Sequence, residues 1–287
     1  MNIIAETELI LTPENKIYHL NLNKDEIADT IILVGDPERV TIISNKFDSI
    51  EHKTQNREFI THTGTLNGKR ISAISTGIGT DNIDIVVNEL DALVNIDFKT
   101  RTINKKKKIL NLIRLGTSGA LQKDIEVDSF LVSFFGLGFD NIAHFYQTEE
   151  IIEHEMSNKY KQHASWPENL SHPYAVKASD NLLSLFPDIK TGITATAPGF
   201  YGPQGRTLRL NPLITNLHEK MESFNFKENR ITNFEMETSA LYYLGQSLGH
   251  NTLTMCAIIA NRFTKEYSKN YKKTVEEMII LVLKRIC

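Results

Sequence analysis

Short runs of apolar residues alternate along the chain with longer segments in which apolar residues recur every three or four positions. The short runs predict buried strands, and the longer segments predict helices with one buried face. The predicted strands are Thr30–Val34, Arg70–Ser75, Ile109–Ile113, Ser129–Phe134, Gly192–Thr196 and Thr252–Ala260. Strands that alternate with helices in this way are typical of a layered α/β protein.

Three helices follow from the same pattern. Between Asn82 and Val94 the apolar residues keep the period of a helix that buries one face. A second helix is expected to begin near Glu235, and a third to cover Thr274–Ile286 with Thr274 as its N-cap. The chain shows no internal repeat and no clear boundary between domains, so residues 1–287 are predicted to form a single domain.

The composition is that of a soluble globular protein. Hydrophobic residues make up 41% of the 287 residues, charged residues make up 23%, and the net charge is −3. A mildly acidic chain argues against a dedicated nucleic-acid-binding protein, which usually has a basic face. Two polar segments, Phe98–Lys108 and Glu149–Pro173, are predicted to be insertions or surface. The lysine run Lys105–Lys108 is interpreted as a solvated loop rather than a site for a polyanion.

Three further observations bear on where the protein works. Met1–Ile10 has two glutamates and no basic segment before an apolar stretch, unlike a signal peptide. The longest apolar run, Met278–Leu283, is far shorter than the ~20 residues that span a bilayer. The two cysteines, Cys256 and Cys287, indicate no disulfide framework. We therefore expect a cytoplasmic protein with no membrane partner.

Three predicted strands are each followed by a turn that contains glycine. The turns are Gly35–Arg39, Thr76–Gly79 and Arg114–Gly119. Because ligands bind at the carboxyl ends of parallel strands, three such turns at one sheet edge would combine free backbone N–H groups with two arginines. These are the parts of an anion-binding site. Taken singly, each turn is more simply the link from a strand to a helix.

A dinucleotide-binding enzyme is a disfavoured alternative. Gly77-Ile78-Gly79 begins a G-x-G-x-x-G fingerprint, but Asn82 stands at the third glycine position. Asp97 lies at about the distance at which the fingerprint places an acidic residue, yet the broken fingerprint gives this agreement little weight. A P-loop is excluded, because no Gly-Lys-Ser/Thr follows a glycine-rich run.

Motifs between Tyr18-His19 and Asn261-Arg262 together resemble the nucleoside phosphorylase family, and within it the uridine-specific members. The resemblance implies a single-domain, three-layer α/β/α fold with a mixed central sheet. It also implies a phosphate site formed by Gly35, Arg39, Arg57, Arg114 and Thr117. Gly35 would contribute its backbone N–H, and Arg57 would reach the site across a dimer interface. Without the resemblance, each of these arginines is more simply a surface residue.

The segment Asn233–Glu237 resembles the ribose site of the family. Glu237 would accept hydrogen bonds from the 2′- and 3′-hydroxyls, and Met236 would pack against the sugar. His19 matches the histidine that reaches the 5′-hydroxyl from a neighbouring subunit. Without the resemblance, the segment is equally well interpreted as a helix N-terminus with favourable acidic residues. A lone histidine is usually structural or exposed.

The segment Gly199–Arg206 resembles the loop that recognises uracil. Phe200 would stack on the base, Gln204 would match the imide edge with one donor and one acceptor, and Arg206 would hold a carbonyl oxygen. Arg262 matches the uridine enzymes at a place where purine-specific relatives usually carry a Ser-Asp pair. Without the resemblance, the segment is interpreted as a flexible Gly/Pro loop.

These matches imply a pentosyltransferase that converts uridine and phosphate to uracil and ribose 1-phosphate. The implied catalytic residues are Arg206, Gln204 and Glu237, which would stabilise the departing base and orient the sugar. Phosphorolysis is favoured over hydrolysis, because the hydrolytic relatives tend to lack the arginine cluster. Two alternatives stay open: a relative with another base preference, and a catalytically inactive nucleoside-binding homologue.

The resemblance implies no cofactor and no catalytic metal, with inorganic phosphate as a co-substrate. Some members hold a monovalent cation between subunits on a glutamate that matches Glu58. Asp81-Asn82 replaces a Pro-Ser pair at that place, so the cation is not assigned here. Because Arg57 and His19 match residues donated between subunits, a homodimer is the expected minimal active unit, and bacterial members assemble such dimers into hexamers. No nucleic-acid partner is expected.

Overall fold

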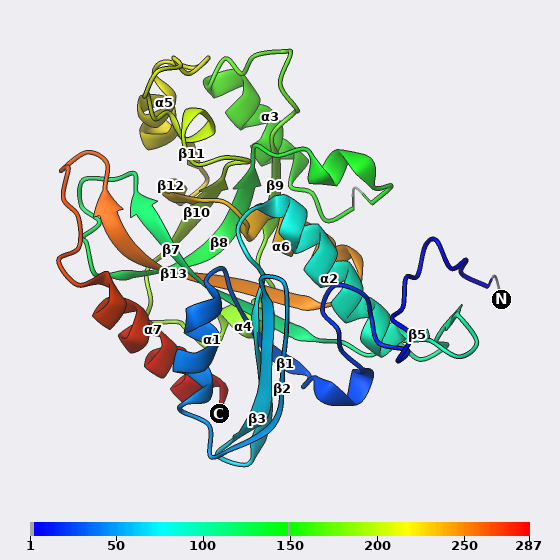
Figure 1. Cartoon of the computed structure of the whole chain (residues 1–287). Helices are drawn as coiled ribbons and strands as arrows, with labels where there is room; N and C mark the ends of the chain where they lie inside the picture. Colours follow the sequence, from blue (N-terminus) through cyan, green and yellow to red (C-terminus); the bar gives the residue numbers. More distant parts are fainter. Residues whose placement is uncertain (1–2, 149) are drawn as a thin grey trace.

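A mixed sheet of eleven strands runs through the computed structural model, which describes residues 3–148 and 150–287 (Figure 1). Met1 and Glu149, the first residues of two segments interpreted above, lie outside the described residues. The strands of this sheet are β1 (Thr30–Val34), β2 (Ser49–Asn56), β3 (Phe59–Leu66), β4 (Lys69–Ser75), β7 (Asn111–Ala120), β8 (Phe130–Gly138), β9 (Tyr174–Lys177), β10 (Thr191–Thr196), β11 (Asn225–Phe226), β12 (Asn229–Glu235) and β13 (Asn251–Asn261). A separate small hairpin consists of β5 (Ile96–Asp97) and β6 (Thr102–Ile103).

The helices connect these strands and cover the sheet. They are α1 (Pro37–Ser44), α2 (Thr80–Asn95), α3 (His154–His163), α4 (Asp180–Leu183), α5 (Leu217–Ser223), α6 (Thr238–Ser247) and α7 (Tyr271–Ile286). Short 3-10 turns are η1 (Lys24–Glu26), η2 (Ile142–Phe145) and η3 (Gly202–Gln204). Among the helices of the described residues, none is long and apolar enough to cross a membrane.

The strand order is β11-β12-β10-β8-β13-β7-β1-β4-β3-β2, and β9 pairs with β8. The central strands β13, β7, β1 and β4 are parallel, so their carboxyl ends meet at one edge of the sheet. At the other side β12 pairs back onto β7 in the antiparallel sense, which closes five strands, β12-β10-β8-β13-β7, on themselves. This closure brings the ends of β7, β12 and β13 together.

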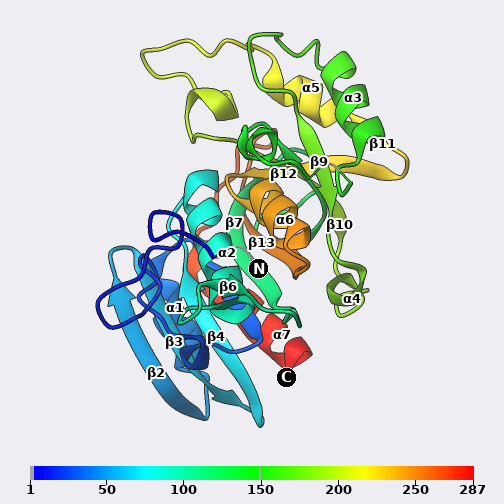
Figure 2. The ribbon, with the colours of Figure 1, turned by 90° about the vertical axis from the view of Figure 1, so that its right-hand side faces the viewer.

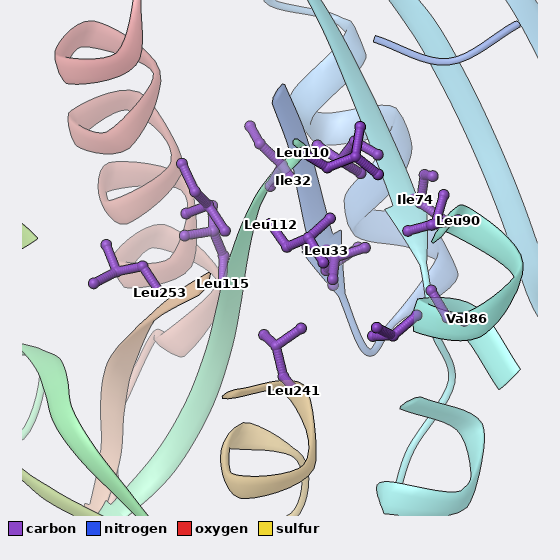
Figure 3. Close-up of a cluster of buried hydrophobic side chains, with 14 of the residues drawn as sticks. Ile32, Leu33, Ile74, Val86, Leu90, Leu110, Leu112, Leu115, Leu241 and Leu253 are labelled. Atoms are coloured by element: carbon purple, nitrogen blue, oxygen red, sulfur yellow. The ribbon is translucent and has the colours of Figure 1, made fainter. Parts of the chain in front are cut away.

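The layers follow from where the apolar residues lie. In Figure 1, α1 and α7 cover one face of the central strands, and α2 and α6 cover the other. All five residues of β1 are buried, as expected of a strand covered on both faces. Figure 3 shows Val86 and Leu90 of α2 beside Ile74 of β4, and burying each such side chain contributes about 1.5–3 kcal/mol. The predicted three-layer α/β fold with a mixed sheet is confirmed.

The predicted turn Arg114–Gly119 is wrong, because β7 continues through this segment to Ala120. Strand β13 pairs with it in parallel, from Asn111 to Ala120. At Gly116 a Cβ atom would lie 2.2 Å from Nη1 of Arg114, so a larger residue would displace the guanidinium. The glycine therefore makes room for an arginine side chain that folds back over the strand, rather than ending the strand.

Two helix starts also differ from the prediction. Glu235 is the last residue of β12, and α6 begins three residues later at Thr238. The last helix begins at Tyr271, and its N-cap is Asn270, whose side chain accepts a hydrogen bond from the Lys273 N–H. Thr274 instead lies inside the helix and donates to Asp128 at 2.6 Å.

The segment after Glu149 is more than a surface insertion. It contains α3 and Trp166. The Trp166 side chain is buried, and its ring centroid lies 4.7 Å from that of Phe139. With Tyr160 and Phe224, this tryptophan belongs to a second apolar core that is separate from the core around β1. Figure 2 shows α3 and α5 at the end of the molecule opposite the β2–β3 hairpin.

Candidate functional site

A cavity of about 550 Å³ opens where β1, β7, β12 and β13 end. Ten of the twelve predicted site residues line it: Gly35, Arg39, Arg114, Thr117, Phe200, Gln204, Arg206, Met236, Glu237 and Arg262. They come from five separate segments of the chain, which the strand order described above brings together. The convergence of these segments is a finding of the tertiary structure.

A larger neighbouring cavity, of about 730 Å³, is almost entirely apolar. Its wall includes Trp166, Leu208 and Leu213, and it shares Arg206 with the first cavity. We place the chemistry in the smaller cavity, because the charged groups that could bind and activate a polar substrate converge there.

One part of the cavity wall is built from the β1–α1 turn and from β7. Asp36 caps α1 by accepting a hydrogen bond from the Glu38 N–H at 3.0 Å, which places Arg39 in the first helical turn. Burial lowers the pKa of the Arg39 guanidinium; Asp36 opposes this shift, and the like charge of Arg114 adds to it. Two partly desolvated guanidinium groups that repel one another are stabilised by an anion that binds both.

Arg114 is buried and is held by two carboxylates. Its Nη2 atom is hydrogen-bonded to Oε2 of Glu237, and its Nη1 atom lies 3.1 Å from Oε2 of Glu235 in a second ion pair. Burial disfavours the charged form of Arg114, but Glu237 and Glu235 outweigh this effect, so the pKa of Arg114 lies above its usual value. Burial and the like charge of Glu235 raise the pKa of Glu237, while Arg114 acts in the opposite direction. Glu237 also accepts a hydrogen bond from the Gly79 N–H at 2.8 Å.

The Gly199–Arg206 segment contains a second functional cluster. Gly205 has a φ of 67°, a left-handed conformation that lets the chain double back so that Gln204 and Arg206 lie side by side. Nη1 of Arg206 donates to Oε1 of Gln204 at 2.6 Å and to the carbonyl of Phe200, and the guanidinium lies 3.5 Å from the centre of the Phe200 ring. Burial, together with the like charge of Arg262, lowers the pKa of Arg206 to about 10.

His19 and Arg57 do not line the cavity of their own chain. They lie on either side of Tyr18, whose ring is 5.8 Å from the Arg57 guanidinium and 4.8 Å from the His19 ring. His19 is held there by Glu89 of α2 and by Asn56, whose side chain donates to the His19 carbonyl at 2.8 Å. Both side chains are at least partly exposed. The structure thus separates these two residues from the other ten and places them in one patch.

Sequence reasoning missed two glutamates. Glu235 pairs with Arg114 inside the cavity wall, and Glu89 holds His19 outside it. A signal for Glu235 was present: Glu235 and Glu237 flank Met236 two positions apart at the end of a strand, where a carboxylate is costly unless it has a partner. No comparable signal marks Glu89, because it lies among the polar residues of an amphipathic helix.

Glu58, which matches the cation-binding glutamate of some family members, is exposed, and its carbonyl accepts a hydrogen bond from the Ser75 hydroxyl at 2.6 Å. Across residues 3–148 and 150–287, no three His, Cys, Asp or Glu side chains converge as metal ligands would. The monovalent cation between subunits stays unassigned.

Comparisons with known proteins agree with the geometry. A family model described as the phosphorylase superfamily matches residues 29–286. A uridine phosphorylase of Thermococcus kodakarensis is 30% identical over 262 residues, which are 91% of this chain and 83% of the relative. A DeoD-type purine nucleoside phosphorylase of Brevibacillus brevis is 28% identical over 268 residues, which are 92% of this chain and 96% of the relative.

A solved structure is similar over nearly the whole chain. It is a nucleoside phosphorylase of Trypanosoma brucei that shows uridine phosphorylase activity. The TM-score is 0.87 at 28% identity, and the match covers 96% of this chain and 98% of the other. The likeness therefore extends over nearly the whole fold.

Proposed function

This chain belongs to the phosphorylase superfamily, and we propose that it is a pentosyltransferase that cleaves uridine with inorganic phosphate. The products are uracil and ribose 1-phosphate. One observation carries the proposal: two pairs of mutually repelling arginines, Arg39 with Arg114 and Arg206 with Arg262, line a single cavity whose wall also contains Glu237. One pair suits phosphate, the other suits a departing anionic base, and the carboxylate suits the sugar between them.

Phosphate is bound by Arg39, Arg114, the Thr117 hydroxyl and the Gly35 N–H. Each hydrogen bond to a charged group contributes about 1.5–3 kcal/mol. The same groups hold the phosphate below the sugar, so that one of its oxygens faces C1′ and the reaction becomes effectively unimolecular.

The reaction forms a bond between a phosphate oxygen and C1′ and breaks the bond between C1′ and N1 of uracil. The electron pair of the broken bond goes to the base, which leaves as an anion and takes a proton from solvent. As the bond lengthens, positive charge on the ribosyl group is stabilised by the bound phosphate. Negative charge on the base is stabilised by Arg206 and by the Gln204 amide.

Base selection follows from the pairing of Gln204 with Arg206. The amide offers one donor and one acceptor to the imide edge of uracil, and Arg206 binds a carbonyl oxygen. Because Gln204 is buried, a base that lacks the matching groups leaves its amide unpaired, which is costly. Arg262, in place of an acid that could protonate a purine, also favours a pyrimidine. The similarity to DeoD-type purine enzymes makes inosine the necessary comparison substrate.

The patch that contains His19 and Arg57 supports a homodimer as the minimal active unit. Two polar residues that the family places in the site lie outside the cavity of their own chain, and a partner related by two-fold symmetry would bring them into the other cavity. Hexamers made of such dimers are the larger assembly we propose. Phosphate is the co-substrate, and we propose no further cofactor.

The test is the release of uracil from uridine, followed by ultraviolet absorbance with and without phosphate. We expect release that depends on phosphate, with inosine turned over much more slowly. Release without phosphate would identify a hydrolase, and faster turnover of inosine would identify a purine enzyme. Uridine binding without release would identify a binding protein.

A further inference from the structure

Glu235 is buried in the wall of the cavity, with a relative exposure of 4%. Its carboxylate accepts hydrogen bonds from the Thr196 hydroxyl at 2.6 Å, from the Glu237 N–H at 2.9 Å and from the Thr238 N–H at 3.0 Å. These donors come from the end of β10 and the start of α6. Backbone and hydroxyl donors therefore occupy both oxygens of Glu235 and leave little capacity for a substrate hydroxyl.

The same carboxylate is the second charge partner of Arg114. Nη1 of Arg114 lies 3.1 Å from Oε2 of Glu235, while Nη2 is bonded to Glu237. The two carboxylates contact two different nitrogens, Glu237 through a hydrogen bond and Glu235 through an ion pair, and together they restrict the orientation of the guanidinium. The two carboxylates differ in their other partners. Glu237 is also the proposed ligand of the sugar, whereas Glu235 accepts hydrogen bonds from backbone N–H groups at the start of α6.

We propose that Glu235 is a positioning residue that keeps Arg114 oriented toward phosphate while Glu237 binds the ribose hydroxyls. This inference rests on the proposed function. When the sugar binds, Glu237 must share its oxygens with the 2′- and 3′-hydroxyls, and its contact with Arg114 is weakened. Glu235 makes no contact with substrate, and its ion pair persists through this exchange. A displaced Arg114 would misplace the attacking phosphate, for which an error of about 1 Å costs about 100-fold in rate.

A purely structural role is the competing explanation, because Glu235 also caps α6. Two variants separate the two roles. Glu235→Gln keeps an oxygen for the backbone N–H groups but removes the charge that pairs with Arg114. Thr196→Val removes a hydrogen bond to the same carboxylate and leaves the charge and Arg114 intact.

The experiment measures phosphate affinity by isothermal titration calorimetry, kcat and KM for both substrates, and the melting temperature of each protein. For Glu235→Gln we expect kcat/KM for phosphate to fall about 10- to 100-fold and phosphate binding to weaken. KM for uridine should change less. For Thr196→Val we expect a lower melting temperature and kinetic constants within about twofold of wild type.

Three results would overturn the proposal. The first is a Glu235→Gln protein with wild-type phosphate affinity and kinetics but a lower melting temperature. The second is tighter phosphate binding in that variant, since Glu235 would then only repel the anion. The third is a Thr196→Val protein with the same kinetic defect as Glu235→Gln.

If Glu235→Gln does not fold, Glu235→Asp replaces it, because it keeps the charge but draws the carboxylate one methylene away from Arg114. It should weaken phosphate binding several-fold, and unchanged binding would contradict the positioning role. Calorimetry also tests the positioning role of Glu235 independently of the proposed uridine phosphorolysis. If wild-type protein binds phosphate but does not cleave uridine, the proposed function fails, while the effect of Glu235 on phosphate affinity is still decided.

Discussion

Nδ1 of His19 lies 2.7 Å from Oε1 of Glu89. The same carboxylate accepts hydrogen bonds from the backbone N–H groups of His19, at 3.0 Å, and of Leu20, at 2.8 Å. A single glutamate on α2 thus holds both the ring and the backbone of an otherwise irregular segment. A carboxylate oxygen only accepts hydrogen bonds, so Nδ1 is the donor nitrogen in this contact, which leaves Nε2 for a hydroxyl of the substrate.

The first prediction concerns Glu89. Replacing it by alanine should raise KM for uridine about 10-fold, because His19 loses its orientation and the hydrogen bond to the 5′-hydroxyl is weakened. KM for phosphate should stay within about twofold of wild type. The comparison substrate is 5′-deoxyuridine, which lacks the hydroxyl.

With 5′-deoxyuridine, wild-type protein, Glu89→Ala and His19→Ala should have similar kinetic constants. An equal loss on both substrates would show that Glu89 acts through the fold rather than through His19. Glu155→Ala, a substitution of an exposed glutamate on α3, is the control for a change of charge elsewhere.

The second prediction tests the shared site by mixing two inactive proteins. Arg57→Ala and Arg206→Ala should each be strongly impaired, because the first removes a phosphate ligand of the partner's site and the second removes a base ligand of its own. In a mixed dimer, one of the two sites has both arginines. Half of the dimers are mixed after random exchange, so the mixture should regain about one quarter of wild-type activity.

Mixing is done by partial denaturation and refolding, with each variant refolded alone as the control. No recovery in the mixture, with exchange confirmed by native mass spectrometry, would place Arg57 outside the partner's site. An active monomer in analytical ultracentrifugation would contradict the dimer itself.

The third prediction separates the two arginine pairs. Arg206→Ala should lower kcat/KM for uridine about 10- to 100-fold, because the anionic base loses a charge-assisted hydrogen bond, and should leave phosphate affinity nearly unchanged. Arg114→Ala should instead raise the phosphate concentration needed for half-maximal rate by a similar factor. Steady-state kinetics with each substrate varied in turn are the measurement. Identical profiles for both variants would mean that the cavity is not divided into a phosphate end and a base end.

The fourth prediction concerns pH. Burial and the like charge of Glu235 raise the pKa of Glu237 above the ordinary glutamate value of 4.5. An acid with a raised pKa takes up its proton at a higher pH, and a protonated Glu237 accepts hydrogen bonds from ribose less well. We therefore expect kcat/KM for uridine to fall as the pH drops, with a midpoint above 4.5.

The control is Glu237→Gln, which should be slower but should lack this decline, because its amide does not titrate. Phosphate titrates identically in both assays, so its own pH dependence cancels from the ratio of the two profiles. A ratio that does not change with pH would assign the decline to another group.

Within the Gly199–Arg206 segment, the motif identifies the residues, and the structure shows how they contact one another. The motif identifies Gln204 and Arg206, but only the folded structure shows that they are hydrogen-bonded to each other. Uridine must therefore replace an internal contact rather than bind to free groups. The left-handed backbone of Gly205 that brings the two side chains together was not predicted from the sequence.

Elements whose signal is local can be predicted from the amino-acid sequence alone. The fully apolar run of β1 and the helical period of α2 identify a buried strand and an amphipathic helix without knowledge of their neighbours. Strand β2 was missed, because it lies at the edge of the sheet and most of its side chains are exposed, so that it has no apolar signal. Motif resemblance likewise identified the site residues one by one.

Which of those residues contact one another depends on how the chain folds. Arg114 and Glu237 are 123 positions apart, and His19 and Glu89 are 70 positions apart, so no local pattern connects them. The pairing of Arg114 with Glu237 depends on the order of the strands and on the closure of β12 onto β7, and the pairing of His19 with Glu89 depends on the packing of an irregular segment against α2. The same is true of Gly116, which looks like a turn residue until the Arg114 side chain is seen to fold over it. An ion pair between distant residues is a property of the packed molecule, because its energy depends on the distance and burial that folding creates.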